Sequence, residues 1–287
     1  MAIHIITDST CDLTREEADE LGVTVLPILV HIAGKDYRDR VDLSADEFYE
    51  KMIEEEELPK TSQITPYAYE EAIQEQIQKG NEVILITCGS TFSGCYHNAY
   101  MVAQDYPETV TVIDSDCASF GLQILVRYAC ELIKRGLSLH EITGILEEEK
   151  KYIHIICLVD TLDYACKGGR VSPLVAAAGK MLGIHPVITV WKRKIEVVGK
   201  ARGSRSGNNL LIKEIVDSGG IRFDMPFCLG YSGLSDRKLK KYIEDSAPLY
   251  EGKTDEGFHI CQFGSSIGTY SGPGAVGCAW FAKKPNR

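Results

Sequence analysis

Residues 82–99 read EVILITCGSTFSGCYHNA. The run over 82–87 is mostly apolar and β-branched, which predicts a strand. The loop that follows collects glycine and hydroxyl side chains, and Gly94 begins a predicted helix. A strand, a polar loop and a helix in this order place free backbone N–H groups at a helix start, where anions bind. The stretch therefore predicts a βα unit that carries an anion site.

The same alternation of strands and helices extends through the first half of the chain. Strands are predicted over 3–7, 23–30, 82–87 and 109–114, and a helix over 119–135 ends before Gly136. Helix starts are predicted at Thr14 with Glu17, Ser44 with Glu47, Thr65 with Pro66, and Ser138 with Glu141. This rhythm is typical of βαβ units in a mostly parallel sheet.

The pattern changes in the second half of the chain. A strand is predicted over 153–159, and strands over 185–191 and 194–201 are joined so tightly that they form an antiparallel hairpin. Further strands are predicted around 225–232, 257–263 and 275–282. We therefore expect two domains, an α/β domain over 1–160 and an α+β domain with a mixed or antiparallel sheet over 161–287.

Composition narrows the classes of function. The 287 residues are 44% hydrophobic, enough for a buried core, and 41 acidic residues against 31 basic ones give a net charge of -10. This charge disfavours nucleic acid and anionic lipid surfaces as partners. No apolar run is long enough to span a membrane and the start lacks an export signal, so we expect a cytoplasmic protein without integral membrane association.

Cysteine and histidine usage gives no sign of a disulfide framework or a metal site. The ten cysteines are scattered and form no C-x-x-C pair, so we expect reduced thiols that are mostly small core residues. The seven histidines are equally dispersed, and no metal is predicted.

The loop over 88–94 could hold a nucleophile or an anion. Ser90, Thr91, Ser93 and Gly94 collect donors at a helix start, although a serine there is also a common helix cap. A nucleophilic serine needs a base and an orienting group, and the G-x-S-x-G elbow is absent. His97 lies a helical turn from Ser93 with no assigned carboxylate, which disfavours covalent catalysis.

Four other segments are candidates for the walls of a site. Residues 60–66, KTSQITP, place hydroxyls in a loop before a helix, and residues 164–173 combine paired glycines with a cation at Arg170. Residues 264–277 contain five glycines in a predicted loop that lacks the order of a phosphate-binding loop. Asp8 and Ser9 are predicted to form a capped turn that shapes the crevice.

Taken in order, these segments resemble the DegV family of bacterial fatty-acid-binding proteins. The matching stretches are ITDSTCDL at 6–13, LPILV at 26–30 with a later YRD, KTSQITP at 60–66, ITCGSTFSGCYHNA at 86–99, VIDS at 112–115, TLDYACKGGRVS at 161–172 and IGTYSGPGAVG at 267–277. No single stretch is specific, but the ordered set spans almost the whole chain.

The resemblance implies a carrier with two α/β domains and a buried long-chain fatty acid such as palmitate, stearate or oleate. Thr61 and Ser93 would hold the carboxylate. The pocket would be completed by Ser62, Ser90, Thr91 and Gly94, with Arg170 near its entrance. The family further implies a separate fatty acid kinase that forms an acyl phosphate, so that no cofactor other than the lipid is expected here.

Two residues depart from the family pattern. The family usually has threonine after the S-G pair, where this chain has Cys95, and often has histidine where this chain has Tyr270. If that histidine takes part in the kinase reaction, its replacement by Tyr270 would impair the reaction with a kinase. Two alternatives stay open, a serine-dependent acyl or ester hydrolase and a regulatory module that binds a small anionic metabolite.

Overall fold

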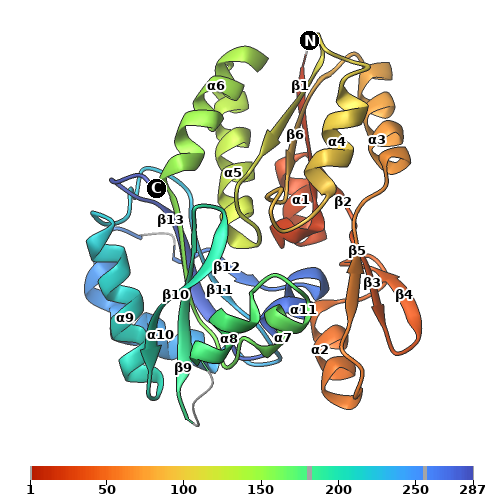
Figure 1. The fold of residues 1–287 in the computed structure, drawn as a ribbon. Helices are drawn as coiled ribbons and strands as arrows, with labels where there is room; N and C mark the ends of the chain where they lie inside the picture. Colours follow the sequence, from red (N-terminus) through yellow and green to blue (C-terminus); the bar gives the residue numbers. More distant parts are fainter. Residues whose placement is uncertain (1, 180–182, 255–256, 287) are drawn as a thin grey trace.

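The computed structural model describes residues 2–179, 183–254 and 257–286, which form three sheets and the helices around them (Figure 1). The strands are β1 (Ile3–Asp8), β2 (Val23–Leu26), β3 (Leu29–Ile32), β4 (Lys35–Arg38), β5 (Lys60–Ser62), β6 (Glu82–Thr87), β7 (Val110–Asp114), β8 (Ile153–Leu158), β9 (His185–Trp191), β10 (Lys194–Ala201), β11 (Phe227–Tyr231), β12 (Ile260–Gln262) and β13 (Val276–Phe281).

The helices fall between these strands. They are η1 (Ser9–Cys11), α1 (Arg15–Leu21), α2 (Ala45–Glu54), α3 (Pro66–Gln78), α4 (Cys95–Ala103), α5 (Phe120–Lys134), α6 (Leu139–Glu149), η2 (Lys150–Tyr152), α7 (Asp163–Lys167), α8 (Pro173–Gly179), α9 (Ser204–Asp217), α10 (Arg237–Tyr250) and α11 (Ser265–Ser271). Within the described ranges, no helix is long and apolar enough to cross a membrane.

The first sheet is parallel, in the order β2-β1-β6-β7. Helices α5 and α6 cover one face and α3 and α4 cover the other, as Figure 1 shows. Ile84 and Ile86 pack on the α5 side, and Val83 and Leu85 pack on the α3 side. Burial of both faces explains why β6 is an uninterrupted apolar run, as parallel strands usually are. The predicted α/β class is confirmed.

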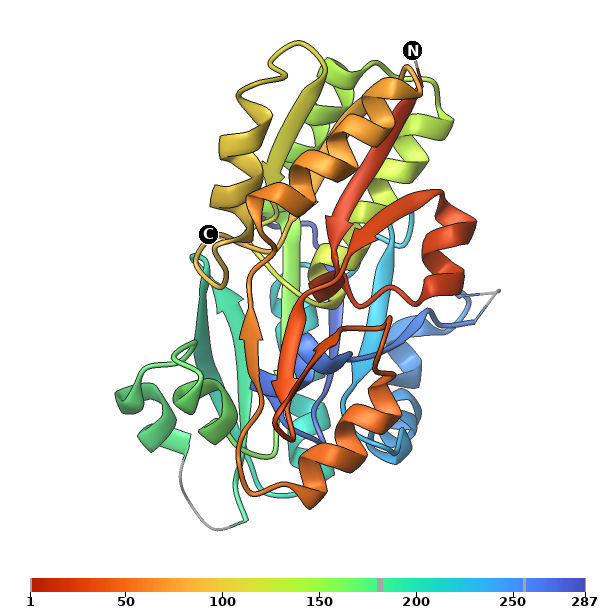
Figure 2. The ribbon, with the colours of Figure 1, turned by 90° about the vertical axis from the view of Figure 1, so that its right-hand side faces the viewer.

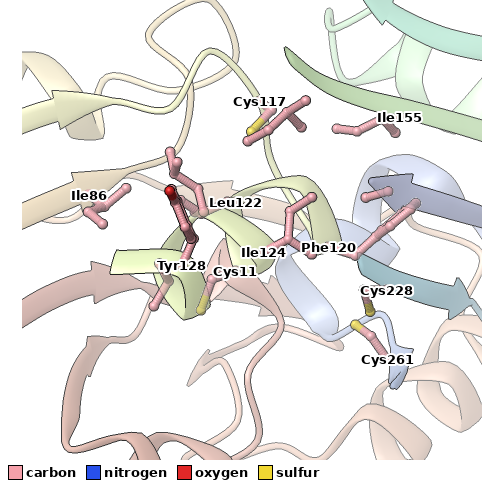
Figure 3. Packing of buried hydrophobic residues seen from close by; sticks show 14 of the residues in the cluster. Cys11, Ile86, Cys117, Phe120, Leu122, Ile124, Tyr128, Ile155, Cys228 and Cys261 are labelled. Atoms are coloured by element: carbon pink, nitrogen blue, oxygen red, sulfur yellow. The ribbon is translucent and has the colours of Figure 1, made fainter. Parts of the chain in front are cut away.

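The second sheet has the order β10-β9-β8-β13-β11-β12 and is mixed, because β11 and β12 are parallel while the other pairs are antiparallel. Helices α9 and α10 pack on one face and α5 packs on the other. Figure 3 shows Phe120, Leu122 and Ile124 of α5 between Ile86 of one sheet and Ile155 of the other. Helix α5 is therefore shared by both cores.

Local signals predicted most helix starts and the hairpin correctly. The capping boxes of α1, α2 and α6 are all formed, and Thr65 caps α3 ahead of Pro66. The hairpin β9–β10 turns at Lys192 and Arg193, whose φ values of 46° and 62° suit the tight turn. Asp8 accepts a hydrogen bond from the Thr10 backbone N–H, as the predicted capped turn requires.

The prediction of one strand over 23–30 is wrong. The chain breaks at Pro27, so that β2 joins the parallel sheet and β3 joins a third, antiparallel sheet with the order β4-β3-β5. Pro27 has no N–H to donate to a ladder, and the N–H of Ile28 donates instead to Ser9 Oγ at 3.0 Å. Figure 2 shows this small orange-red sheet with α2 below the parallel sheet.

Two predicted loops also contain regular structure. Residues 60–62 form β5, an edge strand of the third sheet, in which Thr61 pairs with Val30 of the central strand β3. Within 264–277, the glycine-rich segment contains helix α11. Its central Gly268 permits close packing on α2, since an added Cβ would lie 2.6 Å from Phe48 Cε1 and 2.8 Å from Tyr49 Oη. In this segment, glycine therefore permits close packing of a helix as well as tight turns.

Buried carboxylates join the third sheet and α11 to the parallel sheet. Asp12 accepts hydrogen bonds from the Gly264 N–H at 2.7 Å and from Ser119 Oγ at 2.6 Å, and it lies 3.5 Å from Arg40. Asp39 accepts from the hydroxyls of Ser265 and Ser266, both at 2.6 Å. A buried charge needs such donors, so these contacts determine where α11 begins.

Burial has an electrostatic consequence at Asp12. Loss of hydration raises the pKa of this carboxyl from 3.8 to about 7, against the opposing effects of Arg40 and Ser119. Between these two values the folded protein holds a proton that the unfolded chain has lost. The contribution of Asp12 to stability is therefore largest at low pH and declines as the pH rises through this window.

Replacing Gly268 with alanine should lower the free energy of unfolding by about 1–3 kcal/mol, because the new methyl group overpacks the contact with Phe48 and Tyr49. The matched control is Gly144→Ala in α6, where an added Cβ meets nothing within 4 Å. That substitution should raise the same quantity by about 0.5–1 kcal/mol through helix propensity. Denaturant titration of both variants measures this, and equal effects would contradict the packing at Gly268.

Replacing Asp12 with asparagine should weaken the pH dependence of stability. In the native sequence the free energy of unfolding should fall as the pH rises from about 5 to about 7, and the variant should show a smaller fall. Asp42→Asn is the control, since hydrogen bonding to Arg38 lowers the pKa of Asp42 to about 2, below this window. Parallel pH profiles for the native and Asp12→Asn proteins would show that Asp12 does not titrate there.

Candidate lipid cavity and its polar end

A cavity of about 510 Å³ lies between the two larger sheets and the third sheet. This volume is within the range of about 300–1,000 Å³ that is typical of small-molecule sites. One apolar wall is the α5-facing side of the mixed sheet, where every second residue along and just beyond β8 (Ile155, Cys157 and Val159) lines the cavity. Ile188, Val190 and Ile195 of the hairpin, with Phe120, Leu162, Phe263 and Ile267, extend this apolar surface.

One end of the cavity is polar and is built by three segments. Thr61, Ser62 and Gln63 come from β5 and the residue after it, and Ser93 and Gly94 come from the loop before α4. Ser62 and Gln63 are exposed, so this end lies near the protein surface. The structure therefore brings Thr61, Ser62, Ser93 and Gly94 to the lining of one cavity, with Tyr270 and Arg170 beside them.

Tyr270 is held on three sides. Its hydroxyl lies 2.6 Å from Thr61 Oγ1, and the guanidinium of Arg170 lies over its ring at 4.4 Å from the centroid. Gly168 lies against the same ring, where an added Cβ would come within 2.5 Å. Arg170 also donates to the carbonyls of Phe92 at 3.1 Å and Gly168 at 2.7 Å. Arg170 therefore fixes the position of Tyr270.

Ser93 has a hydroxyl that a ligand can engage. Its Oγ donates to Cys95 Sγ at 3.1 Å, and sulfur is a weak acceptor that an oxygen of a ligand can replace. Burial raises the pKa of Cys95 to about 11, so this thiol stays neutral. Gly94 lets Gln63 approach closely, since an added Cβ would lie 1.8 Å from Gln63 Oε1. Cys95 itself is buried beside Ser93 and does not line the cavity.

Ser90 and Thr91 do not line the cavity. The Ser90 N–H donates to Asp114 Oδ1 at 3.0 Å, and Thr91 Oγ1 donates to the carbonyl of Arg193 at 2.6 Å. Ser90 and Thr91 are the two central residues of a turn that the Phe92 N–H closes by donating to the Gly89 carbonyl. They connect the loop to β7 and to the hairpin instead.

Several polar lining residues were not predicted from sequence. Thr10, Ser119, Ser266 and Ser271 line the cavity, and the first three lie beside the buried carboxylates Asp8, Asp12 and Asp39. The capped turn at Asp8 and Ser9 was a partial signal for Thr10. Nothing local marks Ser119 or Ser266, because their role depends on carboxylates far away in the chain.

The geometry gives no support to a serine nucleophile. His97 is exposed on α4, and within the described ranges no hydrogen bond joins Ser90 or Ser93 to a histidine. Among the residues that the structure describes, no group of three or more histidine, cysteine, aspartate or glutamate side chains could hold a metal ion. All ten cysteines are free, and nine of them are buried. Figure 3 shows the sulfurs of Cys228 and Cys261 facing each other without a bond.

Comparison with known proteins gives consistent results over nearly the full length. The family model described as "Uncharacterised protein, DegV family" matches residues 2–283. A DegV domain-containing protein of Staphylococcus aureus (strain COL) is 31% identical over 278 residues, which cover 95% of this chain and 96% of that protein.

Solved structures of this family have the same fold. A fatty-acid-binding DegV family protein from Thermus thermophilus is 27% identical and superimposes with a TM-score of 0.88, covering 98% of this chain and 100% of its own. The Streptococcus pneumoniae Fatty Acid Kinase (Fak) B3 protein, loaded with linoleic acid, covers 99% and 100% at a TM-score of 0.83. At 22% identity the latter likeness shows the fold alone. On the family match and the relative, this chain belongs to the DegV family.

Proposed function

We propose that this protein binds a long-chain fatty acid in the cavity, with the carboxyl group at Thr61 and Ser93 and the acyl tail along β8, β9 and β10. The observation that carries the proposal is that one cavity has hydroxyl side chains at one end and an apolar sheet face in its wall. Fatty-acid binding by the Thermus thermophilus relative supports it.

The energetics favour a long chain. Each methylene group buried against the apolar wall contributes about 0.8 kcal/mol, or about fourfold in affinity. A buried carboxyl without partners would cost several kcal/mol, which Thr61, Ser93 and the N–H groups at the start of α4 offset. Palmitate, stearate and oleate are ligands of this class.

We further propose that the protein presents its lipid to a separate fatty acid kinase in the cytoplasm, which forms the acyl phosphate. The name of the Streptococcus pneumoniae Fak B3 protein supports this role. The exposure of Ser62 and Gln63 places the carboxyl end near the surface, where a partner enzyme can approach it. In this proposal residues 1–160 carry the loops that bind the carboxyl group, and residues 161–287 contribute to the wall around the tail.

Replacing both Thr61 and Ser93 with alanine should reduce the fatty acid retained after expression in bacteria by tenfold or more, since two hydrogen bonds to a charged or polar group are lost. Organic extraction followed by mass spectrometry measures the bound lipid. The matched control replaces Ser90 and Thr91 with alanine, hydroxyls of the same loop that lie outside the lining. Lipid loss from the control alone would place the carboxyl group elsewhere, and ester hydrolysis abolished by Ser93→Ala would favour a hydrolase.

Affinity for straight-chain acids should rise with chain length and then level off at the length of the cavity. Ile188→Trp should lower that limit, because Ile188 lines the apolar wall and the indole fills part of it. Val198→Trp is the control, since Val198 is exposed on the neighbouring strand. Displacement of a fluorescent fatty acid measures both proteins. Equal affinity for short and long carboxylates would instead favour a site for a small anionic metabolite.

A further inference from the structure

Three hydroxyl side chains in the cavity wall have already used their only hydrogen. Each donates to a carboxylate buried behind it: Thr10 to Asp8, Ser119 to Asp12 at 2.6 Å, and Ser266 to Asp39 at 2.6 Å. A hydroxyl carries one hydrogen and two lone pairs, so where the carboxyl group behind it is ionised, each of these side chains can offer a ligand only lone pairs. We call Thr10, Ser119 and Ser266 the acceptor subsite.

The acceptor subsite lines the same cavity as the predicted carboxyl end. The Ser119 N–H donates to the Thr10 carbonyl at 2.7 Å, which places these two residues side by side. Ser266 lies on α11, one helical turn before Tyr270, whose hydroxyl is 2.6 Å from Thr61. The polar region of the cavity therefore has acceptors in these three hydroxyls. Thr61 can donate to a ligand when Tyr270 donates to it, and Ser93 can donate when a ligand oxygen replaces Cys95 Sγ.

The surrounding charges disfavour a further anion. Behind the acceptor subsite lie three buried carboxylates, and Arg40 is the cation beside them, 3.5 Å from Asp12. The guanidinium of Arg170 donates to two backbone carbonyls and stacks on Tyr270. The charged or titratable groups around this region include Asp8, Cys11, Asp12, Asp39, Arg40, Tyr49, Cys88, Cys95, Cys157, Arg170, Cys261 and Tyr270. An ionised ligand would lose hydration and face these carboxylates, which disfavours its charge.

We propose that the cavity binds the fatty acid in its neutral form, with the carboxyl O–H donating to the acceptor subsite and the carbonyl oxygen accepting from Thr61 and Ser93. This proposal rests on the proposed function and adds the protonation state of the ligand. A neutral carboxylic acid has one donor and one strong acceptor, which match the two sides of the polar region. A carboxylate would match the donor side only.

The test uses the full-length protein loaded with palmitic acid that is labelled with carbon-13 at its carboxyl group. Its carbon-13 resonance is followed by NMR from about pH 5 to about pH 9. We expect the neutral-acid resonance to persist at least about one pH unit above the value near 4.3 of an ordinary carboxyl group. A carboxylate resonance throughout would overturn the neutral-acid proposal and leave fatty-acid binding intact. The absence of any bound resonance would overturn both.

Two neighbouring serines provide the matched comparison. Ser265 and Ser266 both donate to Asp39 at 2.6 Å, but only Ser266 lines the cavity. Ser266→Ala should therefore lower the midpoint of the ligand titration, while Ser265→Ala should leave it near that of the native protein. Equal shifts in both variants would show that the charge of Asp39 acts without contact and would overturn the direct hydrogen bond. If Ser266→Ala fails to fold, Ser119→Ala provides the same test through Asp12.

Discussion

The structure depends on the need of buried carboxylates for hydrogen-bond donors. Asp12 and Asp39 are each about 1% exposed, and an ionised group at such depth is stable only with several charge-assisted bonds. The donors come from the start of α5, from α11 and from Arg40 after β4. Segments more than 200 residues apart in the chain are thereby held together, and the cavity forms where they meet.

The same constraint shapes the chemistry of the cavity. Because Gly264 and Ser265 are bound to these carboxylates, α11 begins at a defined place and directs Tyr270 toward Thr61. The hydroxyls that satisfy the carboxylates also line the cavity, so in the proposed complex the same side chains would serve structural pairing and ligand contact. In that proposal the polar end of the cavity has a donor side and an acceptor side instead of donors alone.

Prediction from sequence succeeded where the cause was local. A capping box needs only residues three apart, and the boxes at Thr14 and Ser44 are formed as predicted. It failed where partners decide the outcome. The run 23–30 has the composition of one strand, yet Pro27 divides it between two sheets. Ser93 and Thr91 lie two residues apart with similar chemistry, and only contact with the Arg193 carbonyl shows that Thr91 belongs outside the cavity lining.

The sequence by itself determined the α/β alternation, the helix starts, the hairpin and the ordered motifs that mark the DegV family, because each follows from residues close together in the chain. Only the tertiary structure decided which hydroxyls share a cavity and which of them still have a hydrogen to donate. Ser265 and Ser266 are chemically identical neighbours, and the turn of α11 alone brings one to the cavity and leaves the other behind it. Such roles depend on contacts between distant segments, which no local pattern records.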